Sequence, residues 1–437
     1  MAGTTEKTEW AGPVASVPEE LTGQPRRVVT ARWDWRHTFV ALRHRNFRLF
    51  FVGQLISLIG TWMQSTAQSW LVYELTGSKL WLGVVAAAGT APMLVFSILG
   101  GSAADRYPKR GIVVLTQSAM MVLAFVLAGL AWLHLVRPPH LVVLAVLGGI
   151  AMAFDMPARQ SFLMEITSRE DLMNAISLNS SIVNMARVAG PAVAGVLMAR
   201  LGVAICFLLN GISFLAVIGG LLLMRLPAAG PRPAPARGHV REGFRYVWGH
   251  RRIKTVLILF GITVIFGWSY SVLLPAFAAE VLRVGEHGYG MLLSANGVGA
   301  LGGALTVAAV HRLFRPRVLA FTGLWLFTAM LLSLAFTRSY ALALTCLAIG
   351  GWGMMLFFAT ANTVVQSSAA DAMRGRVMGI WALVFGGMTP VGSLEAGVLA
   401  QHLGVPRTIA FGALTCAAAA GVTLWHIRRT PEERSPA

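Results

Sequence analysis

The stretch that decides the fold runs from Gly100 to Arg110, Gly-Gly-Ser-Ala-Ala-Asp-Arg-Tyr-Pro-Lys-Arg, and places four charged residues within six positions. Long apolar runs flank it on both sides, at residues 80–99 and 111–136. Twenty apolar residues in a helix span about 30 Å, which is the thickness of one hydrocarbon core. The stretch therefore predicts a tight, charged hairpin between two membrane-spanning helices.

The charges of this hairpin have two interpretations. Short cytoplasmic loops of membrane proteins collect Arg and Lys in any case, so topology alone explains most of them. However, Asp105 stands directly before Arg106, and the glycines that precede them allow two helices to approach closely. We therefore favour a structured, functional loop.

The composition is typical of a helical membrane protein. Of 437 residues, 56% are hydrophobic and 12% are charged, whereas soluble proteins carry about 25% charged residues. The net charge of +18 is not accompanied by basic runs interleaved with aromatic residues, so we expect no nucleic-acid partner. The cysteines, Cys206, Cys346 and Cys416, all lie in apolar runs, and we expect neither disulfides, nor a metal site, nor a cofactor.

Twelve apolar runs are long enough to cross a bilayer, so we predict an all-α polytopic membrane protein with twelve transmembrane helices. The predicted spans are 47–73, 80–104, 111–136, 140–163, 173–199, 203–224, 255–281, 288–310, 318–336, 340–365, 377–401 and 407–427. They divide the chain into an N-terminal tail with an interfacial helix (1–46), a six-helix bundle (47–225), a linker (226–254), a second six-helix bundle (255–427) and a C-terminal tail (428–437). The interfacial helix is expected at 31–46 and a further surface helix at 240–250.

The basic residues predict the orientation. If the N-terminus is cytoplasmic, the inner segments together with the adjoining ends of the spans hold 29 of the 36 Lys and Arg residues, and each of the six outer loops, counted in the same way, holds one. This asymmetry is the positive-inside pattern. We therefore expect both termini in the cytoplasm and the protein in a bacterial inner membrane.

The two predicted bundles repeat one another. Asp171-Leu-Met precedes span five as Asp371-Ala-Met precedes span eleven, and Gly190-Pro191 corresponds to Thr389-Pro390. The offset stays near 200 residues. Chance similarity between apolar helices is the alternative explanation, but several matches in one register favour two parallel six-helix repeats.

The chain resembles the major facilitator superfamily, whose loop between helices two and three reads G-x-L-a-D-R-x-G-R-K. Five residues fit this pattern: Gly101, Asp105, Arg106, Lys109 and Arg110. A proline replaces the second glycine, so the tight turn has to be made differently. Span five is similar to the antiporter motif of this superfamily, with Arg187, Gly190, Pro191 and Gly195 at matching positions.

Further stretches, such as Asn46–Phe50 and Arg374–Gly379, resemble the branch that contains the enterobactin exporter and macrolide efflux pumps. The resemblance implies a rocker-switch carrier with its substrate between the two halves. It also implies that the hairpin charges form a conformational latch, for which Asp155 near the inner end of span four is a candidate partner. The alternative is that the hairpin charges only set the topology.

Two acidic residues inside the spans are candidates for proton coupling, because intramembrane acids are costly and usually functional. Asp155 has Arg159 one helical turn away, so a locally neutralised pair that only supports the helix is the alternative. Glu395 has no basic residue within four positions, and such a carboxyl group favours its protonated form. A protonated or mouth-exposed Glu without a role in transport remains the alternative.

Arg187 inside span five needs a partner, for which Asp155, the substrate, or backbone carbonyls freed by Pro191 are the options. Gly190 and Gly195 permit close helix packing, which requires no ligand. Span one carries a polar stripe on one helical face, which lies along either a water-filled pathway or another helix; its residues are Ser57, Thr61, Gln64 and Gln68. Four further residues are candidates for lining the cavity: Trp268, Tyr270, Asn362 and Gln366. For Tyr270, anchoring at the membrane interface is the alternative.

The sequence contains no phosphate-binding Gly-x4-Gly-Lys-Ser/Thr motif and no His-Glu-x-x-His motif, so we expect a carrier rather than an ATP-driven pump or an enzyme. We expect a monomer in the lipid bilayer that exchanges protons for a small amphipathic compound such as a drug, a macrolide or a siderophore. An importer or uniporter on the same fold is the first alternative. A membrane sensor that does not transport is the second.

Overall fold

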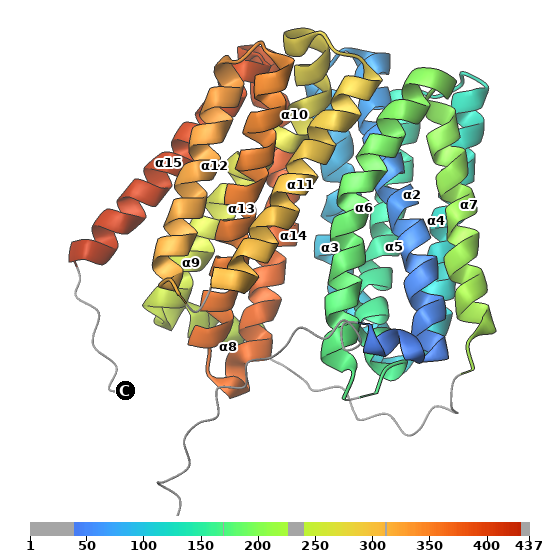
Figure 1. Ribbon diagram of the computed structural model, residues 1–437, viewed down its shortest axis with the longest axis horizontal. Coiled ribbons are helices and arrows are strands. Elements are labelled where there is room, and N and C mark those ends of the chain that lie inside the picture. The colour runs from blue at the N-terminus through green and yellow to red at the C-terminus, as the bar shows by residue number, and fades with distance from the viewer. Residues whose placement is uncertain (1–38, 169, 226–239, 311–312, 430–437) are drawn as a thin grey trace, which may run out of the picture. The chain divides into compact units, whose positions relative to one another are not determined.

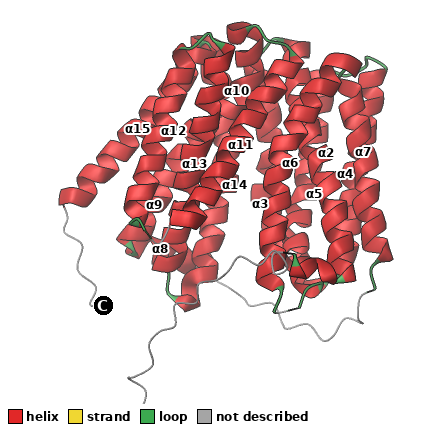
Figure 2. Cartoon of the chain, viewed as in Figure 1, coloured by secondary structure: helices red, strands yellow, loops and turns green. Residues whose placement is uncertain are grey.

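The computed structural model describes residues 39–168, 170–225, 240–310 and 313–429, and within them every regular element is a helix (Figures 1 and 2). In chain order these are η2 (Val40–Arg43), α2 (Arg45–Thr76), α3 (Lys79–Arg106), α4 (Lys109–Trp132), α5 (Pro138–Glu165), α6 (Leu172–Leu201), α7 (Val203–Leu223), α8 (Val240–Gly249), α9 (Arg251–Ile262), η3 (Thr263–Trp268), α10 (Tyr270–Ala276), η4 (Phe277–Leu282), α11 (Glu286–Val310), α12 (Pro316–Phe336), α13 (Tyr340–Ser368), α14 (Asp371–Leu403) and α15 (Val405–Arg429).

Eleven spans among the described residues are long and apolar enough to cross a membrane. One of them, Arg251–Leu282, is a continuous helix that contains the two π-helical segments η3 and η4. The twelfth long helix is α2, which has 32 residues but carries a row of Gln, Ser and Thr that lowers its hydropathy. Outward-facing apolar side chains such as Leu115 (71% exposed) and Phe336 (77% exposed) fit a surface surrounded by lipid.

The predicted charged hairpin is confirmed as a tight turn. Helix α3 ends at Arg106 and α4 begins at Lys109, so only two residues connect them. Tyr107 is extended (φ −106°, ψ 161°), as the residue before a proline prefers, and Pro108 precedes the first residue of α4. The proline thus makes the turn that a glycine makes in the related motif, and the hairpin charges lie on helix ends.

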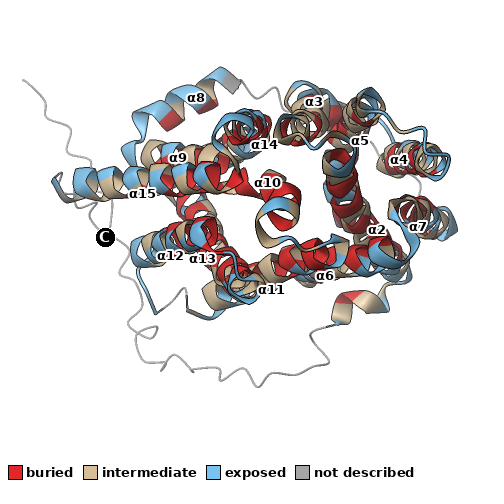
Figure 3. Ribbon diagram, turned by 90° about the horizontal axis from the view of Figure 1, so that it is seen from above, coloured by how far each residue is buried: buried red, intermediate tan, exposed pale blue. Residues whose placement is uncertain are grey.

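The helices form two halves with the same internal pairing. In the first half, α2–α7, helix α3 packs against α5 and α4 packs against α5 and α7. In the second half, α9–α15, the corresponding pairs are α11 with α13, and α12 with α13 and α15. This correspondence fits the predicted parallel repeat. Seen along the helices, α2, α3, α6, α10, α11 and α14 surround the middle of the bundle (Figure 3).

The two halves meet along α3 with α14 and α6 with α11. Glycines allow both contacts: a Cβ atom on Gly83 would lie 2.5 Å from the Ser393 carbonyl oxygen, and one on Gly290 would lie 2.4 Å from the Pro191 carbonyl oxygen. These contacts lie where α2 ends and α11 begins. We call this the far end of the bundle, and the opposite end, where α2 begins and α7 ends, the linker end.

The predicted surface helix at 240–250 is present as α8, which packs on the linker end of α14 through the ion pair between Arg376 and Glu242 (3.1 Å). The predicted interfacial helix at 31–46 differs from the structure where it is described. There the chain forms only the short turn η2 before α2 begins at Arg45. Its remaining part, like the other predicted features at 1–38, 226–239 and 430–437, lies outside the described residues.

Candidate functional site

A cavity of about 520 Å³ lies between the two halves. Helices α2 to α7 contribute one wall, and η3, α10, α11 and α14 contribute the other. Its polar lining side chains include Thr61, Gln64, Gln68, Asn210, Tyr270, Tyr289, Asn296, Thr389 and Ser393. The remaining wall is largely apolar and aromatic, so the cavity can hold an amphipathic organic molecule.

The polar stripe of α2 faces the bundle interior. Thr61, Gln64 and Gln68 line the cavity, and the Oε1 atom of Gln64 accepts a hydrogen bond from the Nδ2 atom of Asn210 (2.7 Å). Ser57 is buried and does not line the cavity; its carbonyl oxygen accepts a hydrogen bond from the hydroxyl of Thr61 (2.9 Å). The stripe therefore serves partly the cavity and partly helix packing.

Arg187 is the one charged residue among the residues that line the cavity. Its guanidinium lies over the ring of Trp62, 5.4 Å from the centroid. Its Nε atom is buried and has no hydrogen-bond partner among the described residues. Across the cavity, the hydroxyl of Tyr270 accepts a hydrogen bond from the Nδ2 atom of Asn296 (2.7 Å).

Trp268 also lines the cavity and stacks on Phe358 (5.9 Å between centroids). The other two candidates from the second half do not line it. Asn362 is half-buried, and Gln366 is exposed, with its carbonyl oxygen accepting a hydrogen bond from Arg374 (3.3 Å). Sequence reasoning missed Trp62, Asn210 and Asn296, because isolated polar or aromatic residues in apolar spans do not reveal which face they occupy.

Asp155 is fully buried outside the cavity wall, in a network of its own. Its Oδ1 atom accepts hydrogen bonds from Thr116 Oγ1 and Gln117 Nε2, both 2.9 Å long. Its Oδ2 atom lies 3.2 Å from the Nε atom of Arg159 but without hydrogen-bond geometry. In this conformation Asp155 therefore forms an ion pair on its own helix, α5, and accepts hydrogen bonds from α4.

The hairpin charges have separate partners at the linker end. Lys109 pairs with Glu165, and Arg110 donates a hydrogen bond to the carbonyl oxygen of Leu222 (2.9 Å). Asp105 and Arg106 are exposed, and no ion pair of Asp105 is present among the described residues. The pairing of Arg110 with Asp155 that the resemblance suggests is absent from this conformation.

The antiporter-motif glycines have packing roles. A Cβ atom on Gly190 would lie 2.5 Å from the Cβ atom of Trp62 on α2, and one on Gly195 would lie 3.1 Å from backbone oxygens of α11. Glu395 on α14 is half-buried and does not line the cavity; its charge lies near Cys416 on α15. Pro191 does line the cavity.

Polar contacts join the halves at the far end. Glu280 forms an ion pair with Lys79 and accepts a hydrogen bond from the hydroxyl of Tyr73. Ser78 donates to Gln401 (3.1 Å), and Trp70 stacks on Tyr289 (5.7 Å between centroids). No local pattern in the sequence indicates this cluster, because its members lie far apart in the chain. Its one signal in the sequence is Glu280, an acid near the end of a span.

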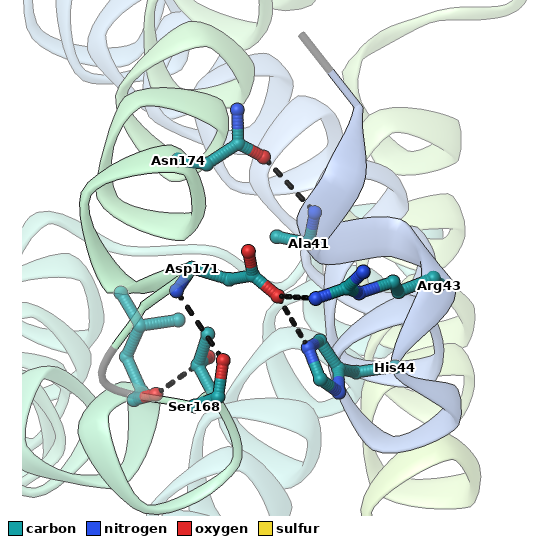
Figure 4. Close-up of polar contacts among 8 residues, drawn as sticks. Ala41, Arg43, His44, Ser168, Asp171 and Asn174 are labelled. Carbon is teal, nitrogen blue, oxygen red and sulfur yellow. Dashed lines mark hydrogen bonds and ion pairs between the residues drawn. The ribbon is translucent and has the colours of Figure 1, made fainter. Parts of the chain in front are cut away.

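A second cluster lies at the linker end, where η2 meets the start of α6 (Figure 4). The Oδ2 atom of Asp171 is 2.7 Å from His44 Nε2 and 2.9 Å from Arg43 Nη2. The backbone amide of Ala41 donates to the Oδ1 atom of Asn174 (3.0 Å). The His44 hydrogen bond, followed by the Arg43 contact, holds the pKa of Asp171 below its ordinary value.

The chain is similar in sequence to known membrane transporters. The family described as "transmembrane secretion effector" matches residues 36–436. The multidrug efflux pump Tap of Mycolicibacterium fortuitum is 29% identical over 374 residues, covering 82% of this chain and 90% of the pump. The staphyloferrin A transporter of Staphylococcus aureus is 26% identical, covering 83% of this chain and 91% of that protein. The enterobactin exporter EntS of Escherichia coli is 27% identical, covering 81% of this chain and 88% of the exporter.

Solved structures share the arrangement of helices. A bacterial homologue of the human lysosomal transporter Spinster, in an inward-facing and unoccupied conformation, gives a TM-score of 0.74 at 14% identity and covers 92% of this chain and 100% of that one. A bacterial homologue of the iron transporter ferroportin, in an inward-facing state, gives a TM-score of 0.69 at 16% identity and covers 87% of this chain and 98% of that one. At these identities the likeness shows the fold alone.

Proposed function

We propose that this chain, which belongs to the transmembrane secretion effector family of the major facilitator superfamily, is a proton-coupled exporter of amphipathic compounds. Membership of this family makes it a multi-pass membrane transporter of small molecules. The observation that carries the proposal is the cavity of about 520 Å³ between two halves that contact each other at the far end. Relatives that export drugs or siderophores, Tap and EntS, support the direction of transport.

We propose that the linker end faces the cytoplasm of a bacterium and that the protein acts as a monomer in the inner membrane. Support for the orientation comes from the 29 of 36 basic residues that lie on that side in the twelve-span topology. In this orientation the far end faces away from the cytoplasm, and its cross-half contacts are those expected of an inward-facing carrier. Alternating access then requires the contacts of Glu280 and of Gly83 to separate as the linker end closes.

The hairpin residues are proposed to form a latch in the opposite, outward-facing state. Asp105 is exposed and available for a partner when the linker ends of the two halves approach. Lys109 and Arg110, which already bind Glu165 and the Leu222 carbonyl, would fix the base of the hairpin. Partly dehydrated charge pairs at such a junction couple more strongly than exposed ones, which favours a role in conformation rather than in topology alone.

Proton coupling is assigned to Asp155 or Glu395. Asp155 is buried in a network with Thr116, Gln117 and Arg159, so a change in its protonation would rearrange contacts between α4 and α5. Glu395 is half-buried on α14, the helix that meets α3 across the halves. Neither residue lines the cavity, so the proposed coupling acts through helix packing.

The experiment is transport in proteoliposomes with an imposed pH gradient and a fluorescent amphipathic substrate. A proton antiporter accumulates the dye in vesicles with an acidic lumen, and dye flux dissipates the gradient. An importer by symport accumulates dye with the opposite gradient, a uniporter ignores the gradient, and a sensor gives no flux. Asp155→Asn and Glu395→Gln are compared with wild type: the coupling residue is the one whose variant still moves dye down its own gradient but no longer moves protons.

A further inference from the structure

The residues that line the cavity carry charge of one sign. Among the lining residues Arg187 is charged, and neither Asp nor Glu is present. A guanidinium stays protonated under any physiological condition. The cavity therefore carries one permanent positive charge without a protein counter-ion in its wall.

The candidate partners of Arg187 within the protein are engaged elsewhere. Asp155 is held by Thr116, Gln117 and Arg159 within the first half. The buried Nε atom of Arg187 has no hydrogen-bond partner among the described residues, so a carbonyl freed by Pro191 does not bind this atom either. The guanidinium of Arg187 instead lies over the face of the Trp62 ring. Such a cation–π contact leaves the N–H groups at the edge of the guanidinium free to donate hydrogen bonds to a ligand.

A donor from the second half faces the same space. The hydroxyl of Tyr270 accepts a hydrogen bond from Asn296, so its own hydrogen is free to be donated. Arg187 and Tyr270 are close enough to interact electrostatically, and both line the cavity. A negatively charged group placed here would receive hydrogen bonds from α6 of one half and from α10 of the other.

We propose that the cavity contains an anion subsite formed by Arg187 and Tyr270, and that the physiological substrates are amphipathic organic anions such as carboxylates. The apolar and aromatic wall holds the hydrophobic part of the molecule, and the subsite holds its charge. A charge without a counter-ion in the wall of a largely apolar cavity is costly, and a bound carboxylate removes that cost. This inference rests on the proposed function only in taking the cavity as the substrate site, and it does not depend on proton coupling.

The test measures binding to the full-length protein in nanodiscs at neutral pH, with empty nanodiscs as the background. Three probes share one ring system and differ in charge: 1-naphthylacetate, 1-naphthylacetamide and 2-(1-naphthyl)ethylammonium. Quenching of Trp62 and Trp268, which line the cavity, provides the signal. The anion is expected to bind at least about tenfold more tightly than the amide, the effect of one hydrogen bond to a charged group, and the cation most weakly.

Variants separate a binding role from a structural one. Arg187→Gln is expected to weaken binding of the anion far more than binding of the amide, so that the preference for the anion is lost, and Arg187→Lys is expected to retain part of this preference. Tyr270→Phe, which removes a hydroxyl but no charge, should weaken binding of the anion by roughly threefold to tenfold and binding of the amide by less. The amide serves in each variant as the internal control for a folded cavity.

Three results would overturn the subsite. One is wild-type protein that binds the amide or the cation as tightly as the anion, or that binds no anion. Another is an Arg187→Gln variant that loses all three probes equally while Arg187→Lys and Tyr270→Phe retain the full charge preference. The last is dye export in proteoliposomes that does not depend on the charge of the substrate. Charge-selective binding without gradient-driven export would instead refute the proposed function and leave the subsite standing.

Discussion

The ammonium group of Lys79 on α3 and the carboxylate of Glu280 on η4 form an ion pair that joins the two halves of the molecule at the far end. The hydroxyl of Tyr73 donates to the same carboxylate. In the proposed alternating-access cycle this pair breaks when the far end opens, because its members belong to different halves. In that cycle the pair contributes to the free-energy difference between the state closed at the far end and the state open there.

Removing this pair is expected to shift the population toward states open at the far end. In Lys79→Met or Glu280→Gln, the closed state loses a contact between side chains that are 18% and 38% exposed, a contact contributing on the order of 0.2–1 kcal/mol. The ratio of open to closed states should rise by up to about fivefold. Spin labels at exposed Arg200 and Arg338 report the distance by pulsed electron resonance, and the native cysteines, which are buried, do not compete for the label.

The matched control is Lys109→Met, which breaks an ion pair with Glu165 inside the first half. It should leave the far-end distance distribution as in wild type. A distribution unchanged in both Lys79→Met and Glu280→Gln, or one shifted equally by the control, would show that the pair has no influence on which end is open.

Glycines at the same interface give a second prediction. A Cβ atom on Gly397 would lie 2.9 Å from the Lys79 carbonyl oxygen and 3.0 Å from the Cα atom of Gly83, and backbone atoms cannot move aside cheaply. Gly397→Ala is therefore expected to force α14 away from α3 and to destabilise the far-end-closed state by about 1–3 kcal/mol. The same spin-label pair should detect the shift.

Gly379 is the control on the same helix, because nothing lies within 4 Å of a Cβ atom built there. Gly379→Ala should leave the distance distribution unchanged and raise thermal stability slightly, since Ala favours helix over Gly by about 1 kcal/mol. If Gly397→Ala behaves like Gly379→Ala, the close approach of α3 and α14 is not what holds the far end closed.

The buried network of Asp155 yields a stability prediction independent of transport. Asp155→Asn removes the ion pair with Arg159 and leaves the guanidinium with its hydrogen bond to Gln54 (2.8 Å). The expected loss is about 1–3 kcal/mol of unfolding free energy, visible as a lower melting temperature in detergent micelles. Adding Arg159→Gln should recover part of the loss, because the uncompensated charge is then gone. A double variant at least as unstable as the sum of the single variants would contradict this account.

The sequence predicted the helices well because bilayer thickness limits the length of an apolar helix. It missed features that depend on contacts outside the bilayer: α14 begins at Asp371, not at 377, because its polar first turns extend past the membrane and bind α8 through Arg376. In the site, the spacing of Thr61, Gln64 and Gln68 correctly indicated one shared helix face. The partners across the halves, such as Glu280 for Lys79, depend on tertiary packing that no local pattern encodes.

The cluster of Asp171 at the linker end gives a prediction for pH. The folded state holds the pKa of Asp171 below its ordinary value of 3.8, chiefly through His44 and then Arg43. A lowered pKa means that the ionised form of Asp171 stabilises the docked η2 turn. This stabilisation is fully present at pH values above 3.8 and is lost as the pH falls below that value through the lowered pKa. Hydrogen exchange at the Ala41 amide, which donates to Asn174, should report the loss as faster exchange relative to the intrinsic rate.

Two variants separate the carboxylate from the rest of this cluster. Asp171→Asn should give faster exchange at Ala41 at neutral pH and abolish the acid-dependent change. Asn174→Ala removes a neutral hydrogen bond worth about 1 kcal/mol, so its exchange should be faster at every pH by a similar factor while the acid-dependent change persists. If protection at Ala41 is instead independent of pH in wild type, the contacts of Asp171 with His44 and Arg43 do not hold η2 against α6, and the turn is held by the hydrogen bond to Asn174 and by the packing of Ala41.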